Sequence, residues 1–384
     1  MNVTKECKNI YLGNTPIKKV FAGNDLVWQK LRPFKSFKQD IESSVFESIY
    51  LFDDKILMVH SNGKQEDFYQ RYENNKAITI GVFDLNTNQY TRPNMSNPVF
   101  MKAKISGKTK NGVFSFGLPS APGQQYIDRT KLDVFFFNKD GRYKTDSLRG
   151  FDDFDNHKHI CNMNTSIVSV RVNSTNSGED RLLYVYDCDS MSSSIQNLGR
   201  QDAYAGARGL GVLSNTSNDR LATLYIDRDG KTTTKFYDTK QRRWIASYPW
   251  TEEANQNIER YFSNGAPIMS YYLGEDCYLF HDNSSYTLLS LTGDMLHEDS
   301  LDVTLPRNPK IFPTYGNKNI VFMFAIEKTL HVVNMDGTIS KYSFDGFIES
   351  ADIIEVDGIR RIAVVYYGSN GCVLEYKEEA ALAV

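Results

Sequence analysis

Short apolar or aromatic runs alternate along the chain with polar turns, and one pattern recurs. An apolar strand ends in Asp, Asn or Thr, a tight turn follows, and a more polar strand comes after the turn. Asp and Asn suit such turns because their side chains bond nearby backbone groups and tolerate left-handed geometry. The pattern predicts six hairpins, whose turns are opened by Asp84, Asn138, Asp187, Asp238, Thr292 and Asn334.

The hairpins recur roughly every 50 residues, which indicates a repeat architecture. Two further strand-like runs precede each hairpin; in the second unit they are residues 98–105 and 112–118, ahead of the apolar run 131–137. Four strands in each repeat unit are typical of the blades of a β-propeller. A β-sandwich would not need units of this even size.

The last unit is incomplete. After the sixth hairpin the chain has three strand-like runs, 349–356, 361–368 and 372–378, and no fourth. Residues 34–41 form an unpartnered strand-like run before the first unit, and pairing it with the last unit would remove an open sheet edge. The sequence therefore predicts an all-β fold in which residues 34–384 form a seven-bladed β-propeller, with six or eight blades as the alternatives.

Residues 1–31 stand apart from these repeats and predict a small β module of three short strands, 9–13, 17–23 and 25–29. So short a module buries little apolar surface alone. Leaving Tyr11, Phe21 and Trp28 exposed would be costly, so the module is expected to pack on a partner or on the propeller.

Composition excludes several classes of protein. The formal net charge of −3 and the absence of a basic block give no electrostatic support for nucleic-acid binding. Five widely spaced cysteines predict neither a disulfide scaffold nor a cysteine zinc site. The N-terminus lacks the apolar segment of a signal peptide, and no run of about 18 apolar residues predicts a membrane span. We expect synthesis in a reducing cytoplasm, and no cofactor.

The N-terminal segment carries a resemblance. Leu12-Gly13, residues 17–21, Gly23 and residues 26–28 resemble a short module found in tail and other virion proteins of bacteriophages, with Phe21 where Tyr is usual. The resemblance covers about 25 residues. It implies a protein mounted on the virion through its N-terminus, with docking residues Tyr11, Leu12, Phe21, Val27 and Trp28.

Candidate chemistry is sparse. Asp153 and Asp155 lie in an acidic cluster that could hold a divalent ion, although a solvated loop is the stronger interpretation, and we predict no metal site. No Ser-His-Asp, Cys-His or paired-Glu arrangement is recognisable from neighbouring positions. Such sites assemble from distant residues, so their absence weakens an enzymatic interpretation without excluding it.

The longest inter-strand segments carry exposed-looking aromatic residues, which suit protein partners and sugar rings. The predicted partner-binding residues are Phe68, Tyr69, Tyr72, Tyr126 and Trp250.

Together these features predict a non-catalytic attachment protein of a bacteriophage tail, located on the virion in several copies. It would contact other virion proteins or a host surface glycan or protein. The alternatives are a carbohydrate-active propeller enzyme, with carboxylates converging on the central channel, and a cytoplasmic interaction scaffold.

Overall fold

The structure of the chain is a computed structural model. The structure describes residues 10–12, 15–17, 19–22, 25–29, 34–41, 45–61, 77–93, 99–119, 131–149, 157–162, 166–175, 178–187, 190, 192–201, 212–214, 220–226, 231–256, 269–273, 277–281, 284–301, 310–312, 317, 319–368 and 371–381. Within these ranges the regular structure is β-strand, apart from the helical residues 252–256. The predicted all-β class is confirmed.

The strands pair almost entirely with their neighbours in sequence, as the repeats predict. The first two units share one sheet: β6 (Val45–Leu51), β7 (Lys55–Ser61), β8 (Ala77–Asp84), β9 (Gln89–Thr91), β10 (Val99–Thr109), β11 (Gly112–Pro119), β12 (Lys131–Asn138) and β13 (Tyr143–Arg149). β8 and β10 join the two halves through the pairs Val99↔Ile78 and Phe100↔Ala77.

Four-stranded antiparallel sheets follow in chain order. The next two are β14 (His157–Asn162), β15 (Ser166–Thr175), β16 (Gly178–Asp187), β17 (Ser192–Gln201), and β18 (Val212–Ser214), β19 (Arg220–Ile226), β20 (Thr232–Asp238), β21 (Arg243–Pro249). After them come β22 (Met269–Leu273), β23 (Cys277–His281), β24 (Ser285–Ser290), β25 (Met295–Ser300), and β26 (Lys310–Phe312), β27 (Ile320–Ile326), β28 (Thr329–Asn334), β29 (Ile339–Ser343).

The last sheet combines both ends of the repeat region. It contains β30 (Phe347–Val356), β31 (Ile359–Gly368), β32 (Gly371–Ala380) and β5 (Ser36–Ile41), in that order. β5 is antiparallel to β32, with Cys372 opposite Ile41 and Lys377 opposite Ser36. The segment assigned from sequence as the closing strand thus occupies the outer edge of this composite sheet.

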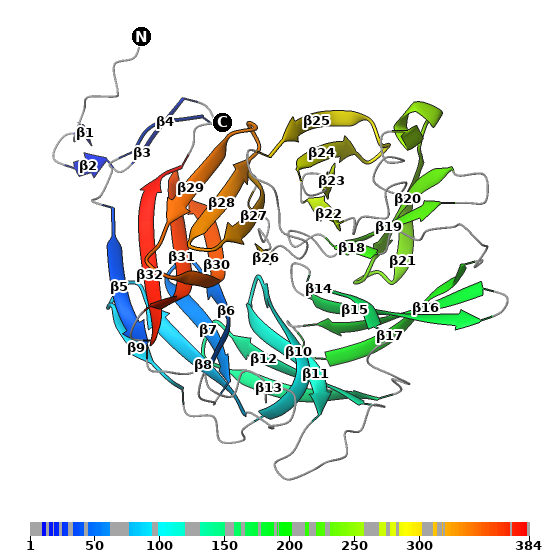
Figure 1. Cartoon of the computed structure of the whole chain (residues 1–384), viewed down its shortest axis with the longest axis horizontal. Helices are drawn as coiled ribbons and strands as arrows, with labels where there is room; N and C mark the ends of the chain where they lie inside the picture. The colour runs from blue at the N-terminus through cyan, green and yellow to red at the C-terminus, as the bar shows by residue number, and fades with distance from the viewer. Residues whose placement is uncertain are drawn as a thin grey trace.

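The sheets follow one another around a common centre (Figure 1). The first strand of a unit contacts the first strand of its neighbour at the junctions β6–β10, β10–β14, β14–β18, β18–β22, β26–β30 and β30–β6. Apolar side chains fill the spaces between neighbouring sheets. Ile56 and Met58 of β7, for example, share a buried cluster with Leu374 and Tyr376 of β32.

The turn chemistry follows the sequence closely. The Asp84 carboxylate accepts hydrogen bonds from the backbone N–H groups of Asn86 and Thr87, both at 2.8 Å. Asp238 accepts from Gln241 N–H at 2.7 Å. The predicted turn-opening residue Thr292 is wrong by two positions. Ser290 opens that turn, because its N–H donates to Asp294 O at 2.8 Å and its hydroxyl accepts from Asp294 N–H.

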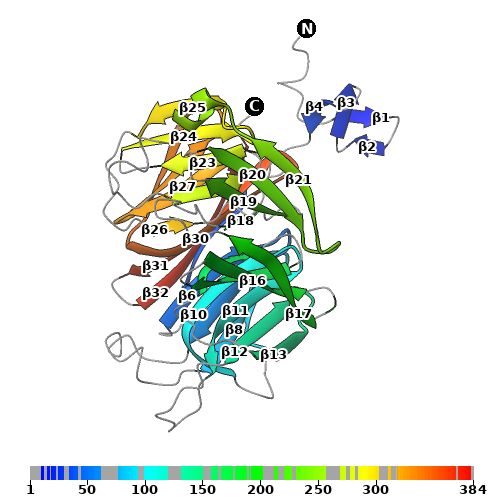
Figure 2. The same cartoon turned by 90° about the vertical axis from the view of Figure 1, so that its right-hand side faces the viewer.

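The N-terminal segment also differs from expectation. It forms two hairpins, β1 (Ile10–Leu12) with β2 (Thr15–Ile17), and β3 (Lys19–Ala22) with β4 (Asp25–Gln29), instead of three strands. The run 17–23, expected as one strand, is divided. Ile17 pairs with Ile10 of the preceding strand β1, whereas Lys19–Ala22 pairs with the following strand β4. Figure 2 shows both hairpins standing apart from the larger sheets.

Candidate functional site

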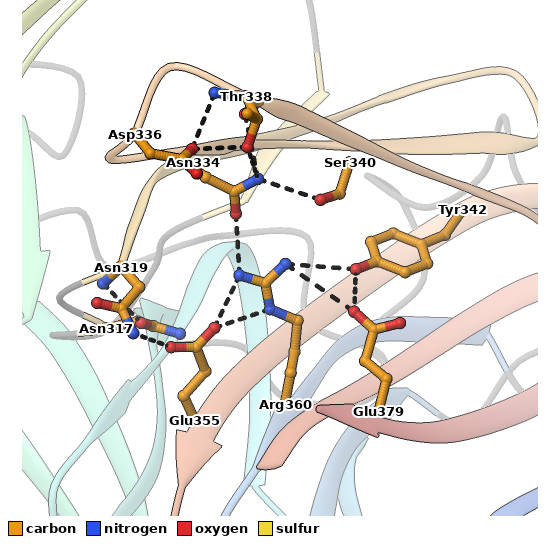
Figure 3. A network of polar contacts seen from close by, with 10 residues as sticks. All are labelled: Asn317, Asn319, Asn334, Asp336, Thr338, Ser340, Tyr342, Glu355, Arg360 and Glu379. Atoms are coloured by element: carbon orange, nitrogen blue, oxygen red, sulfur yellow. Dashed lines mark hydrogen bonds and ion pairs between the residues drawn. The ribbon is translucent and has the colours of Figure 1, made fainter. Parts of the chain in front are cut away.

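A buried arginine connects the composite sheet to the β26–β29 sheet. Arg360 of β31 is 1% exposed, and its Nε donates to Glu355 Oε1 at 2.8 Å while Nη2 donates to Asn334 Oδ1 at 2.9 Å. Nη1 lies 3.4 Å from the Tyr342 hydroxyl and 4.0 Å from Glu379 Oε1 (Figure 3). Two carboxylates, an amide and a phenol therefore surround one guanidinium.

This network holds sheets together and is poorly suited to acid–base chemistry. The Tyr342 hydroxyl donates to Glu379 Oε1 at 2.5 Å. Burial raises the pKa of Tyr342, and the bond to Glu379 raises it further, so the phenol is neutral at pH 7 and not poised as a base.

A second buried charge pair lies among the first strands of three units. Asp352 of β30 is fully buried, and its Oδ2 accepts from Leu51 N–H at 2.7 Å and from Lys108 Nζ at 3.0 Å. Lys108 also donates to the Leu51 carbonyl. Beside them, the Ser350 hydroxyl accepts from Ile49 N–H at 3.0 Å. Burial raises the pKa of Asp352, and the charge of Lys108 opposes that effect.

β5 also lies at the junction between the first unit and the composite sheet. Phe37 stacks on Phe83 at 4.5 Å and on Tyr376 at 5.2 Å, so its ring lies between the first unit and the composite sheet. Lys35 Nζ donates to Leu85 O at 2.7 Å. Polar groups of the composite sheet thus form hydrogen bonds to both neighbouring sheets.

An exposed surface lies on the opposite side of the ring, on the outer strand β21 and the turn before it (Figure 1). Arg242 of the turn and Arg243, Trp244 and Tyr248 of β21 are all exposed, and we call these four residues the β21 edge. Trp244 is 42% and Tyr248 37% exposed, which is unusual for aromatic rings of this size.

Both exposed rings are held edge-on against buried rings of β20. Trp244 meets Tyr237 at 5.3 Å and 75°, and Tyr248 meets Phe236 at 5.8 Å and 79°. The register shifts between Phe236 and Tyr237. Because successive strand residues face opposite sides of a sheet, the two exposed rings lie on opposite faces of the edge strand. The arrangement offers fixed apolar surfaces on either side of one strand.

This surface was not predicted from the sequence. Residues 234–244 predict a hairpin, and two arginines and a tryptophan stand at the end of its turn. A basic pair next to Trp at a predicted hairpin tip was the available signal.

Trp250, predicted to bind a partner, is buried, and that prediction is wrong. Trp250 is 6% exposed, and its Nε1–H donates to Thr234 Oγ1 and to Leu291 O, both at 2.9 Å. A Cβ on Gly293 would lie 2.3 Å from the indole ring. Trp250 fills the space between two neighbouring sheets.

The other predicted positions lack described side chains. Phe68, Tyr69, Tyr72 and Tyr126 lie outside the described residues, as do Asp153 and Asp155. For the docking set the structure describes the backbone alone, which places Tyr11 and Leu12 in β1, Phe21 in β3, and Val27 and Trp28 in β4. The docking of these residues on a partner stays a prediction.

The described part of the chain contains no group of three or more His, Cys, Asp or Glu side chains placed to hold a metal ion. It also contains no helix long and apolar enough to cross a membrane.

No protein family and no curated protein matches the chain. Solved structures do match. The β-propeller domain of the Trilobed protease from Pyrococcus furiosus aligns with 89% of this chain and 99% of its own, at 9% identity and a TM-score of 0.48. A prolyl endopeptidase aligns with 89% of this chain at 9% identity and a TM-score of 0.49, and the match spans 48% of its length. A polysaccharide lyase aligns over 97% of this chain and 94% of its own, at 7% identity and a TM-score of 0.44.

These matches correct the functional prediction. Each of the three proteins is described as an enzyme or as an enzyme's propeller domain, and none is described as a phage protein. The predictions of a phage attachment protein and of a non-enzymatic chain are therefore wrong. At these identities the likeness concerns the fold, so the chain is an all-β protein with β-propeller structural neighbours.

Proposed function

We propose that this chain is a carbohydrate-active propeller enzyme, with the β21 edge as part of its polymer-binding surface. The observation that carries the proposal is the pair of exposed rings, Trp244 and Tyr248, each held by a buried aromatic neighbour. Flat apolar rings with a polar edge suit the faces of sugars, and rings already held in place lose little entropy on binding. β21 is an edge strand with exposed residues toward both of its ends, and each ring offers a separate stacking surface.

The same proposal includes the blade count. The eight-stranded sheet counts as two blades, β6–β9 and β10–β13, because only two residue pairs join its halves. The four internal sheets and the composite sheet then bring the number of blades to seven. The contacts between successive first strands support this count.

Residues 1–31 are included as a separate attachment module. β1 pairs with β2 and β3 with β4, and both two-stranded sheets are distinct from the blades. Its target, and any partner of the aromatic residues 68, 69, 72 and 126, stay predictions.

The experiment is a turnover assay of the full chain on a panel of acidic and neutral polysaccharides, with a mixed peptide library as the matched alternative. New reducing ends would indicate a hydrolase or a lyase, and ultraviolet absorbance of an unsaturated sugar would identify the lyase. Peptide cleavage without sugar cleavage, or no turnover of any substrate, would overturn the proposal.

A further inference from the structure

The hairpin that carries the β21 edge is strongly basic. Within residues 231–249 one acidic residue, Asp238, is set against five cations: Lys231, Lys235, Lys240, Arg242 and Arg243. By contrast, residues 285–300, the corresponding hairpin of the next sheet, contain three acidic residues and no Lys or Arg. The excess of positive charge in this hairpin contrasts with the formal net charge of −3 of the whole chain.

Part of the charge of this hairpin is already used within the protein. Lys240 pairs with Asp187 of the preceding sheet, and Asp238 caps its own turn. Arg243 donates through Nε to Gln241 Oε1 at 2.8 Å, a neutral acceptor that leaves the positive charge uncompensated. The two arginines of the β21 edge therefore dominate the field at the hairpin tip.

Arg242 occupies a backbone position that ordinarily goes to glycine. Its φ is +55°, a left-handed value that Asn88, Glu327 and Asp357 also have in other hairpin turns, whereas Gly141, Gly293 and Gly337 hold the corresponding positions elsewhere. A residue with a Cβ costs about 1 kcal/mol or more there, and strained positions of this kind concentrate at functional sites. Glycine fits this backbone, so Arg242→Gly removes the side chain without straining the turn.

Arg242 lies two residues before Trp244 in the sequence. Trp244 packs on Tyr237, and the charge of Arg242 acts on the same phenol, where it lowers the pKa of Tyr237 against the larger opposite effect of burial. A cation and an exposed indole therefore both act on Tyr237.

We propose that the β21 edge binds an anionic polysaccharide, with Arg242 and Arg243 pairing with its carboxylate or sulfate groups and Trp244 stacking on a sugar ring. Guanidinium groups pair well with both kinds of anion, and the aromatic ring recognises the sugar itself. The proposal rests on the proposed function and names its substrate class.

The test measures binding of the full chain to polygalacturonate, dextran sulfate and neutral dextran by affinity electrophoresis at two salt concentrations. We expect binding to at least one of the two anionic polymers, weakening with salt, and little binding to dextran. Arg242→Gly and Trp244→Ala should each lower that affinity on the order of tenfold. Arg142→Gly is the matched control, since Arg142 is an exposed arginine of the β12–β13 turn and should leave affinity unchanged.

Loss of binding in Arg242→Gly cannot be attributed to unfolding if its melting temperature equals or exceeds that of the unmodified chain, as glycine relieves the left-handed backbone. Equal binding to dextran and dextran sulfate, unchanged affinity in Arg242→Gly, or no binding to any polymer would overturn the inference. Cleavage of a polysaccharide by the Arg242→Gly variant at unchanged affinity would leave the proposed function standing. Arginine-dependent binding of a polysaccharide without turnover of any polysaccharide would support the binding inference and overturn the proposed function.

Discussion

Arginine serves two different purposes in this molecule, and comparing Arg360 with Arg242 shows how burial decides between them. Arg360 is 1% exposed and is surrounded by Glu355, Asn334, Tyr342 and Glu379. Arg242 is exposed at a hairpin tip, beside a half-exposed tryptophan. A buried charge must have its partners within the protein, whereas an exposed charge keeps its capacity to bind something else.

The composite sheet and the β21 edge differ in the same way. Around the composite sheet, charged and polar groups join strands from both ends of the chain, so substitutions there should alter stability. At the β21 edge, the corresponding groups project from a strand whose backbone already pairs with β20. Substitutions there should alter binding and leave the fold intact.

The largest expected effect comes from Arg360→Met. The substitution keeps the apolar stem but leaves Glu355, whose side chain is 8% exposed, without its cation. We expect the free energy of unfolding to fall by about 3–5 kcal/mol, measured by urea denaturation. The comparison would fail if Arg360→Met were as stable as Arg142→Gly.

Trp250→Ala should also cost about 3–5 kcal/mol of stability, because it leaves a cavity between two sheets and removes the partner of Thr234. Trp244→Ala is the matched variant, and it should cost much less because that ring is 42% exposed. Thermal melting of the two variants tests whether Trp250 is buried in the folded protein. Equal losses would contradict that burial.

His60 gives a smaller effect that depends on pH. Its side chain is buried against Tyr90, and burial lowers the pKa of His60 from 6.5 to about 3. The unfolded chain therefore binds a proton first, so stability is fully present above pH 6.5 and is lost as the pH falls toward 3. The expected slope is about 1.4 kcal/mol per pH unit. Denaturation midpoints from pH 7 to pH 4 measure it, and a His60→Leu variant without a shallower slope would contradict the assignment.

The smallest expected effect on stability comes from Arg242→Gly, which should gain about 0.5–1 kcal/mol or leave stability unchanged. Differential scanning calorimetry against Arg142→Gly measures this difference. A clear loss of stability would mean that Arg242 supports the hairpin, and the contrast with Arg360 would then disappear.

Much of the fold could be predicted because its signals are local. Each hairpin joins strands a few residues apart, and Asp84 and Asp238 cap their turns through N–H groups two or three residues away. The same locality explains the error at Thr292. Ser290, Thr292 and Asp294 all carry oxygen atoms within one turn, and composition alone does not say which residue opens it.

The candidate site was less predictable. Trp244 and Trp250 lie six residues apart in the same strand-and-turn region, yet one is exposed and the other is buried. Their difference depends on whether the neighbouring sheet covers the ring, and that sheet comes from residues 269–300.

The sequence by itself determined the all-β class, the repeated hairpins and the turn residues, because alternation and turn chemistry act between near neighbours. Only the tertiary structure decided which charges are buried and which are available. Arg360 meets Asn334 across 26 residues, Asp352 meets Lys108 across 244, and Lys35 meets Glu378 across 343. Such pairings arise when the sheets assemble around a common centre, and no short stretch of sequence contains both partners.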